Sequence, residues 1–263
     1  MVKYERRILC FIDILGFSNI IKKTMKEGDE AQKELDNTCN ALDFLREYCE
    51  KIRKYKISTN QFSDSIVISF PWKKDDWELI AVFKSIKLIQ VTLLYRYNLL
   101  LRGGIVIGNI LHTNKILIGP AMIDAYMLES KCANSPRIIL DPKVVSEFNK
   151  FNNKAKQNGI NDNNFIIHKD LDDTSYIDYF NIEESEIMKY IDLKQYFKVL
   201  CQHIAANINS TDISIRVKYL WMRNKLKSSK LFLLPEYRDI YRSVVTNKGK
   251  EKRVEETEEN WAR

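Results

Sequence analysis

The sequence predicts an α/β protein, in which helices pack against a β-sheet and a helical segment follows the sheet. Short apolar runs rich in Ile and Val predict strands, and longer stretches with apolar residues three to four apart predict helices. The 263 residues are 45% hydrophobic and 29% charged, which fits one main hydrophobic core with a helical extension. Strands and helices alternate up to about residue 180, so we expect them to share one layered domain.

The first two predicted elements are a buried strand and a long, interrupted helix. Residues 7–14 form an apolar run rich in Ile, and Gly16 ends it. Residues 17–55 then predict a helix, broken near Gly28, because its apolar residues recur as one stripe. The stripe consists of Leu35, Ala41, Leu42, Leu45, Cys49 and Ile52.

The following elements, up to residue 180, are marked by proline and by turn residues. Pro71 stops a strand because proline cannot donate to a strand ladder. Pro120, after Gly119, opens a helix because proline fits the first helical turn. The predicted elements are strands at 56–59 and 64–70 around a turn at 60–63, a helix at 75–100, strands at 105–111 and 116–118, a helix to about 130, a strand at 137–141, a helix at 142–151, a turn-like segment at 152–164, and hairpin strands at 165–169 and 176–180.

This order, strand-helix-strand-strand-helix-strand with extra hairpin strands, is that of a ferredoxin-like α/β sandwich. From about residue 186 the pattern becomes helical to about residue 245, and the charged end of the chain predicts a mobile tail. We therefore expect an α/β domain at 1–182, a C-terminal helical extension at 183–245 and a charged tail at 246–263.

The composition bounds where the protein works. No apolar run reaches about 18 uncharged residues, and the N-terminus reads as the approach to a strand, so we expect neither a membrane span nor a signal peptide. Five scattered cysteines without a C-x-x-C motif predict reduced thiols in a cytoplasmic protein and no zinc site. The net charge of +7 fits a Lys-rich and Asn-rich chain, nucleotide handling or nucleic-acid binding, but its basic residues form no dense cluster.

Two short acidic stretches carry the strongest chemical signal, F-I-D-I-L-G-F-S at 11–18 and N-Q-F-S-D-S-I-V-I-S at 60–69. Asp13 lies at the end of an apolar strand-like run, and Asp64 lies at the start of another. Because they are far apart in the sequence, the two meet only if adjacent strands of one sheet carry them. Either aspartate alone reads as a strand-end or turn residue, whereas the pair predicts a Mg²⁺ or Mn²⁺ site that carries phosphates.

Gly16, Phe17 and Ser18 lie where the first strand turns into a helix. Amides at a helix N-terminus favour anions, and glycine lets the backbone come close to a ligand. The segment therefore predicts a phosphate cradle beside Asp13, or else an ordinary strand-to-helix turn.

Together these motifs resemble the class III nucleotidyl cyclases. The stretches F-I-D-I-L-G-F-S and F-S-D-S-I-V-I-S resemble the two metal motifs, L-R-G-G-I-V-I-G resembles the Arg-x-Gly-Ile strand, and G-P-A-M-I-D-A-Y-M-L-E-S resembles the helix that closes the site. The four follow in order and cover roughly residues 6–180. The match is closest to the stand-alone uridylate and cytidylate cyclases of Pycsar anti-phage defence systems, through the bare cyclase domain, S-P-R-I-I-L and V-K-Y-L-W.

The resemblance implies a cytoplasmic homodimer with shared active sites that converts UTP or CTP to the 3′,5′-cyclic monophosphate and pyrophosphate. The ribose 3′-hydroxyl attacks the α-phosphorus, and catalysis rests on positioning and charge neutralisation. Two Mn²⁺ or Mg²⁺ ions would be held per site. The product would reach a cyclic-nucleotide effector without direct contact between the two proteins, and neither nucleic acid nor a membrane would be a partner.

The resemblance also assigns roles to single residues. Asp13 and Asp64 would bridge the ions, with the backbone carbonyl of Ile14 as a third ligand. Arg102 would contact the triphosphate through its planar guanidinium, and Lys169 would match a second phosphate-binding position. Apart from the family, Arg102 reads equally well as a surface arginine.

Two departures from the family concern the base. Asn60 stands where purine-specific members carry a base-selecting Lys, and Ile116 stands at the second base-selecting position. Neither purine-reading residue is kept, which favours a different base without choosing between uracil and cytosine.

Two further departures concern the transition state. Ile123 and Met127 align with the family's transition-state Asn and Arg, and a neutral Met cannot stabilise developing phosphate charge. Tyr126 in the same helix fits either the pocket or the core. Either another cation substitutes, or the protein is slow, or it is a cyclase-like nucleotide-binding or interaction module without catalysis. The candidate cations are Arg7, Arg102 and Arg137.

Overall fold

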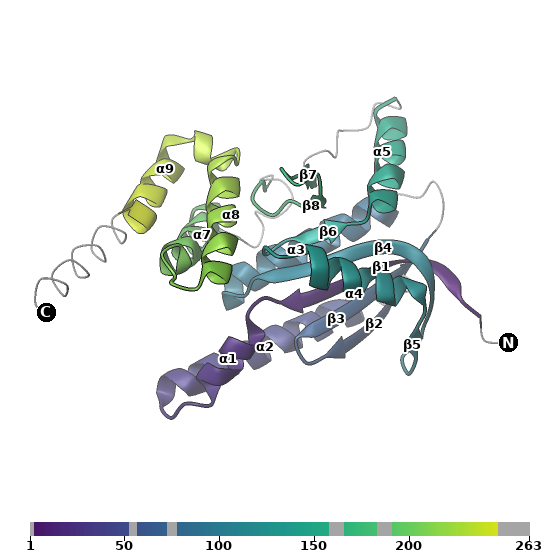
Figure 1. Cartoon of the computed structure of the whole chain (residues 1–263), viewed down its shortest axis with the longest axis horizontal. Coiled ribbons are helices and arrows are strands. Elements are labelled where there is room, and N and C mark those ends of the chain that lie inside the picture. The colour runs from purple at the N-terminus through teal and green to yellow at the C-terminus, as the bar shows by residue number, and fades with distance from the viewer. Residues whose placement is uncertain (1–2, 53–56, 73–77, 158–165, 183–190, 247–263) are drawn as a thin grey trace, which may run out of the picture. The chain divides into compact units, whose positions relative to one another are not determined.

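The computed structural model describes residues 3–52, 57–72, 78–157, 166–182 and 191–246, and divides the chain into two compact units, Met1–Tyr179 and Phe180–Arg263 (Figure 1). Apart from Thr246, the predicted tail at 246–263 lies outside the described residues, as does the start of the helical extension at 183–190. None of the described helices is long and apolar enough to cross a bilayer.

The first unit is built on one mixed sheet. Its strands are β1 (Glu5–Ile14), β2 (Ser58–Phe62), β3 (Ser65–Pro71), β4 (Leu101–His112), β5 (Leu117–Ile118), β6 (Ile138–Leu140), β7 (Ile167–Lys169) and β8 (Ser175–Ile177). The strand order is β2-β3-β1-β4-β6-β8-β7, with β5 paired to β4. β1 lies antiparallel between β3 and β4, so the four long strands have the order of a ferredoxin-like sheet. The predicted α/β sandwich is confirmed.

Most helices of this unit cover one face of the sheet. Its helices are α1 (Phe17–Thr24), α2 (Asp29–Ile52), α3 (Glu78–Tyr97), α4 (Pro120–Cys132) and α5 (Pro142–Gln157). Alternate β1 residues such as Ile8, Cys10 and Ile12 point into the main core, where they meet apolar side chains of α2, α3 and α5. The break predicted near Gly28 is present between α1 and α2, where Gly28 has a φ of 111°.

The opposite face of the sheet, which we call the α4 face, is covered more thinly. A small core of Leu9, Phe11, Val67, Val106 and Ile110 packs there against Ala121 and Ala125 of α4. Glycine makes this close approach possible, because a Cβ at Gly104 would lie 2.7 Å from the Ala125 carbonyl oxygen. Since side chains alternate along a strand, the odd-numbered residues of β1 from Arg7 to Asp13 all belong to the α4 face.

Two predicted boundaries are wrong. The turn predicted at 60–63 is strand up to Phe62, because Asn60 and Phe62 pair with Val67 and Ser65 of β3, and the chain reverses at Ser63, which has a φ of 54°. The turn-like segment predicted from 152 is helical up to Gln157. Phe151 packs on the main core there, so tertiary contact outweighs the poor helix propensity of the Asn residues.

The second unit is helical, as predicted. It contains α7 (Leu193–Asn207), α8 (Ile213–Lys227), the 3₁₀ turn η2 (Leu231–Leu233), α9 (Pro235–Tyr241) and the π-helical turn η3 (Arg242–Thr246). Asp192 and Asp212 cap α7 and α8 by accepting hydrogen bonds from first-turn amides. The aromatic side chains are used for packing: Trp221 meets Phe180, Phe232 meets Tyr241, and Tyr219 stacks on His203.

Candidate active site on the α4 face

The predicted metal aspartates lie at the same edge of the sheet. Asp13 is the penultimate residue of β1, and its registered neighbours are Ser65 on β3 and Arg102 on β4. Asp64 comes directly before Ser65, in the turn that joins β2 to β3. The antiparallel register therefore brings together residues from three separate stretches of sequence.

Asp13 is held by hydrogen bonds from both neighbouring strands. The Ser65 hydroxyl donates to Oδ1 at 3.0 Å, and Arg102 donates to Oδ2 from Nε at 3.1 Å and from a terminal nitrogen at 3.0 Å. The Asp13 side chain is 13% exposed and that of Arg102 is 32% exposed, so the ion pair lies at the surface of the site. This contact fixes the carboxylate in one orientation while a ligand can still reach it.

A further carboxylate, Glu129 of α4, reaches the same arginine from above the sheet. Its Oε1 lies 2.8 Å from Nε of Arg102, and its side chain is 3% exposed. The single Nε–H is directed at Asp13, and Oε1 of Glu129 has no hydrogen-bond donor among the described residues. One guanidinium therefore serves two carboxylates that arrive from different layers of the fold.

The charge at this edge is not balanced. Burial raises the pKa of the Asp13 carboxyl, and the neighbouring Asp64 carboxylate raises it further, against the lowering effect of the bonds from Ser65 and Arg102. Burial also raises the pKa of Glu129; Arg102 opposes this shift, and Asp13 and Asp64 add to it. A cation that settled between the aspartates would relieve this repulsion.

The strand-to-helix turn after Asp13 has the backbone of an anion cradle. Gly16 adopts the left-handed conformation, with φ 78° and ψ 19°, directly before α1. The amides of Phe17 and Ser18 belong to the first helical turn, where an α-helix leaves N–H groups without intrahelical acceptors. The first turn carries no acidic residue, so nothing on this helix competes with a phosphate for these amides.

The described residues contain no group of three or more His, Cys, Asp or Glu side chains arranged to hold an ion. A divalent cation at this edge would therefore rely on Asp13 and Asp64 together with phosphate oxygens, as Mg²⁺ sites commonly do. The uncompensated charge on the carboxylates fits such an ion.

A second polar cluster lies farther along the α4 face, where β4 curves over the sheet toward β2 (Figure 1). His112, the last residue of β4, has Nδ1 2.8 Å from the Ser69 hydroxyl and Nε2 2.5 Å from Oδ1 of Asn60. Arg7 donates from Nε to the same Ser69 hydroxyl at 2.8 Å. The predicted base-reading residue Asn60 is thus part of a buried relay that starts at Arg7.

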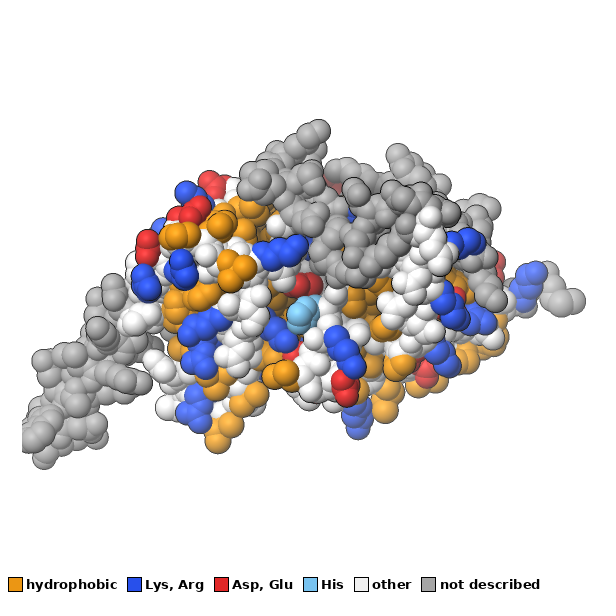
Figure 2. Space-filling model, turned by 90° about the horizontal axis from the view of Figure 1, so that it is seen from above, with side chains coloured by type: hydrophobic (Ala, Val, Ile, Leu, Met, Phe, Trp, Pro, Cys, Tyr) orange, Lys and Arg blue, Asp and Glu red, His pale blue; other side chains and the backbone are white. Residues whose placement is uncertain are grey.

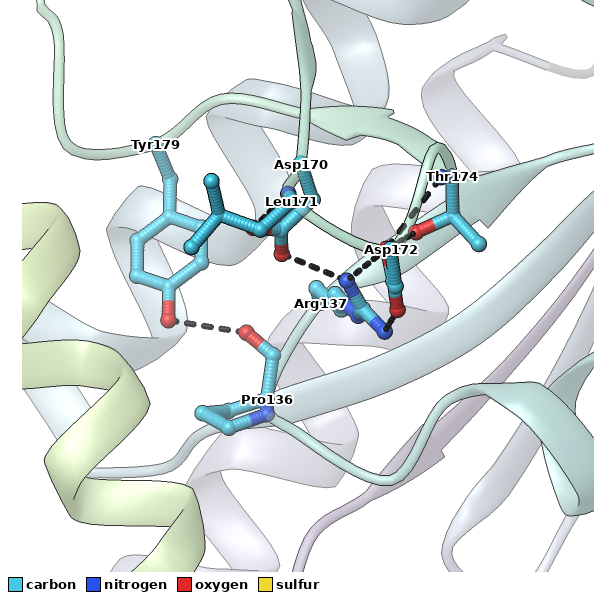
Figure 3. Close-up of polar contacts among 7 residues, drawn as sticks. All are labelled: Pro136, Arg137, Asp170, Leu171, Asp172, Thr174 and Tyr179. Carbon is cyan, nitrogen blue, oxygen red and sulfur yellow. Dashed lines mark hydrogen bonds and ion pairs between the residues drawn. The ribbon is translucent and has the colours of Figure 1, made fainter.

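Of the three candidate cations for the transition state, Arg102 alone contacts Asp13. Arg7 is buried in the relay. Arg137, before β6, donates to Asp170 at 2.5 Å and to Asp172 at 2.5 and 3.2 Å (Figure 3). These bonds fasten the turn between β7 and β8 to Arg137, and Tyr179, just after β8, donates to the carbonyl of Pro136, the residue before Arg137. We therefore assign Arg137 to the fold.

Other predicted site residues are not brought to Asp13 within one chain. Lys169 lies on β7, four strand positions from β1, or about 19 Å across the sheet, and forms an exposed ion pair with Asp173 at 2.7 Å. Ile123 and Met127 point outward from α4, with exposures of 65% and 44%, and Ile116 is exposed near β5. Tyr126 is half exposed and meets Phe11 edge to face.

Sequence reasoning missed Ser65, Glu129 and His112. Ser65 is the registered neighbour of Asp13, and the motif F-S-D-S contains it. Glu129 ends the predicted closing helix, but nothing in a helical pattern tells that a carboxylate is buried. His112 reads as isolated in the sequence, and only the bend of β4 brings it to Asn60.

No protein-family model matches the chain, and no curated protein matches it. Its structure is similar to that of the adenylyl cyclase CyaB from P. aeruginosa, at 15% identity and a TM-score of 0.44, over 56% of this chain and 82% of that one. It is also similar to the monomeric guanylyl cyclase domain of the RhoGC fusion protein from the aquatic fungus Blastocladiella emersonii, at 13% identity and a TM-score of 0.46, over 66% and 95%. At these values the similarity assigns no activity to this chain.

Proposed function

We propose that this protein is a metal-dependent nucleotide cyclase that converts UTP or CTP to the 3′,5′-cyclic monophosphate and pyrophosphate. The observation that supports it most is the edge formed by Asp13, Asp64 and Arg102 beside the N-terminus of α1. Carboxylates for a cation, amides for phosphates and an arginine for the triphosphate lie together there. Burial and the neighbouring Asp64 carboxylate raise the pKa of Asp13, so a cation bound there would stabilise its ionised form.

In this proposal each group has one task. Asp13 and Asp64, with the Ile14 carbonyl, hold two Mn²⁺ or Mg²⁺ ions, which when bound supply charge for the attacking and leaving oxygens. The amides of Gly16, Phe17 and Ser18 orient the outer phosphates. These groups hold the α-phosphorus in line with the 3′-hydroxyl, so that positioning supplies most of the rate.

Arg102 is the cation that replaces the family's missing one. Without nucleotide its guanidinium rests on Asp13, and Glu129 holds it from the side. With Asp13 engaged in holding a metal ion, the Arg102 guanidinium would keep Glu129 as its partner and direct its other N–H groups to the triphosphate. Glu129 is then a positioning residue that keeps the Arg102 guanidinium from rotating away from the site into solvent.

The outer surface of α4 supports a homodimer with shared sites. Ile123, Tyr126 and Met127 are exposed at a spacing of three and four, so they form one apolar strip on the helix. Contiguous exposed apolar side chains mark interaction surfaces. In a dimer this strip would meet a second copy, and Lys169 of one subunit would serve the site of the other.

The proposal includes a cytoplasmic role in anti-phage defence, in which the cyclic nucleotide carries the signal to an effector. It includes neither nucleic acid nor a membrane as partner. On the face shown in Figure 2, Lys and Arg side chains are interspersed with acidic and apolar ones rather than gathered into one basic patch. A phosphate backbone is bound by clustered basic residues, so this distribution does not favour it.

A second candidate is a cyclase-like module that binds nucleotides without turnover. The exposed apolar side chains of Ile123 and Met127 favour it, since they cannot neutralise a developing phosphate charge. It shares the metal and phosphate groups with the first candidate and differs only in the absence of product.

Incubation of the full chain with each of the four NTPs and Mn²⁺, followed by mass spectrometry, tests the proposal. We expect cyclic UMP or cyclic CMP and pyrophosphate. Cyclic AMP or cyclic GMP alone would reject the pyrimidine part. Metal-dependent nucleotide binding with no cyclic product would establish the second candidate instead.

A further inference from the structure

The relay on the α4 face is unusual because it joins strands that are not neighbours. β2 and β4 lie three positions apart in the sheet, yet His112 of β4 contacts Asn60 of β2. Ser58 of β2 also donates to the His112 carbonyl at 3.1 Å. The end of β4 is therefore tied to β2 through both its side chain and its backbone, and the position of Asn60 depends on it.

The hydrogen-bond donors and acceptors fix the direction of the relay. A guanidinium has no acceptor, so Arg7 donates from Nε to the Ser69 hydroxyl and from a terminal nitrogen to the Ser69 carbonyl. The hydroxyl can then donate its own hydrogen to Nδ1 of His112. Because an amide oxygen only accepts, Nε2 of His112 must carry a hydrogen and donate it to Oδ1 of Asn60.

The hydrogen bond from His112 leaves the amide nitrogen of Asn60 available to a ligand. Its amide oxygen is occupied by His112, whereas its amide nitrogen has no hydrogen-bond partner among the described residues. The side chain is half-buried on the α4 face. An unrestrained asparagine can turn either its oxygen or its nitrogen to a ligand, whereas the bond from His112 holds this amide in one orientation, with its nitrogen, a donor, available.

We propose that Asn60, locked by His112, reads the carbonyl oxygen at C4 of a uracil base and so selects UTP over CTP. This rests on the proposed function, whose base it names. Cytosine carries an amino group at C4, and two facing donors would leave both unpaired in a half-buried site. A cost of this kind corresponds to about 10- to 100-fold in affinity. His112 is a positioning residue, since it acts through Asn60.

Binding of the 3′-deoxy analogues of UTP, CTP, ATP and GTP to the full chain with Mn²⁺, measured by calorimetry, tests the inference without turnover. We expect the UTP analogue to bind about 10- to 100-fold more tightly than the CTP analogue. Equal affinities, or a preference for the CTP analogue, would overturn the inference while nucleotide binding itself remained. Failure of all four analogues to bind would reject the proposed function and the inference with it.

Variants separate the relay from simple packing. In His112→Phe the amide of Asn60 is free to rotate, so the preference should fall to within about threefold; His112→Gln keeps a donor and should restore part of it. Asn60→Asp presents an acceptor instead and should favour the CTP analogue, since carboxylates accept from the cytosine amino group.

Asn109→Asp changes an exposed residue of β4 and is the matched control, which should keep the wild-type preference. Thermal unfolding confirms that each variant is folded. If Asn60→Asp and His112→Phe both keep the wild-type ratio, Asn60 does not read the base.

Discussion

At one end of the α4 face Arg102 meets the carboxylates of Asp13 and Glu129, and toward the other end Arg7 meets the hydroxyl of Ser69. Arg102 contacts Asp13, and Arg7 lies six residues earlier on β1, or about 20 Å along the strand. The relay leads back from Arg7 to Asn60, which pairs with Val67, the neighbour of Phe11 on β1. Both arginines use a guanidinium to fix a neighbouring side chain. They differ in the chemistry of that side chain, which is a carboxylate in one case and a hydroxyl in the other.

At the carboxylate end, burial and the neighbouring carboxylates raise the pKa values of Asp13 and Glu129. Binding of a cation would therefore stabilise the ionised carboxylates of this end. The relay end begins at the Arg7 guanidinium and continues through a hydroxyl, an imidazole and an amide, so it passes on the direction of a hydrogen bond to Asn60. We propose that one end holds a metal–phosphate group and that the other selects the ligand.

Asp64→Ala removes a carboxylate from the charged end and has the largest expected effect. Cyclic-nucleotide formation should fall about 10³-fold, because the ions that stabilise the reacting oxygens lose a ligand worth several kcal/mol. Initial rates by mass spectrometry measure it. Asp43→Ala, at an exposed position of α2, should keep the wild-type rate. An Asp64→Ala enzyme of full activity would remove the metal role.

Arg102→Lys keeps a positive charge but loses the planar fork, so kcat should fall about 10²-fold. Arg96→Lys, at the exposed end of α3, is the matched control and should change little. If the two lysine variants lose activity equally, Arg102 has no special place in the site and the contrast between the two arginines fails.

The carboxylate end could be predicted from the sequence, whereas the relay end could not. The order of elements follows from apolar periodicity, and it places the two aspartates on antiparallel neighbours before any coordinates are known. Glu129 and His112 could not be found this way, because burial of a carboxylate and the bend of β4 depend on packing between distant elements. The turn before Asp64 was misplaced, since β2 has a turn-like composition and is held as a strand by β3.

Metal and nucleotide should together stabilise the fold through the charged end. With Mn²⁺ and the 3′-deoxy-UTP analogue at about ten times their apparent Kd, the free energy of unfolding should rise by about 1.4 kcal/mol. Thermal scans measure this as a higher Tm. Asp64→Ala should show no such rise, and a rise of equal size in that variant would place the ligand elsewhere.

Glu129→Gln should have a modest effect that raises stability and lowers activity. The pKa of Glu129 is raised in the folded protein, so stability present below about pH 4 is lost as the pH rises through the raised value. In chelated buffer at pH 7 the variant should therefore be more stable by about 0.5–2 kcal/mol in urea unfolding, while its turnover falls. Glu47→Gln, exposed on α2, should leave the pH profile unchanged. A less stable Glu129→Gln protein at pH 7 would show that its ion pair with Arg102 outweighs its burial.

The most direct measurement is a crystal structure of the full chain with Mn²⁺ and the 3′-deoxy-UTP analogue, with anomalous scattering recorded to locate manganese. The account predicts anomalous peaks between the carboxylates of Asp13 and Asp64, with Arg102 withdrawn from Asp13 toward the triphosphate. Nucleotide bound with manganese at neither aspartate, and Arg102 still paired to Asp13, would contradict it.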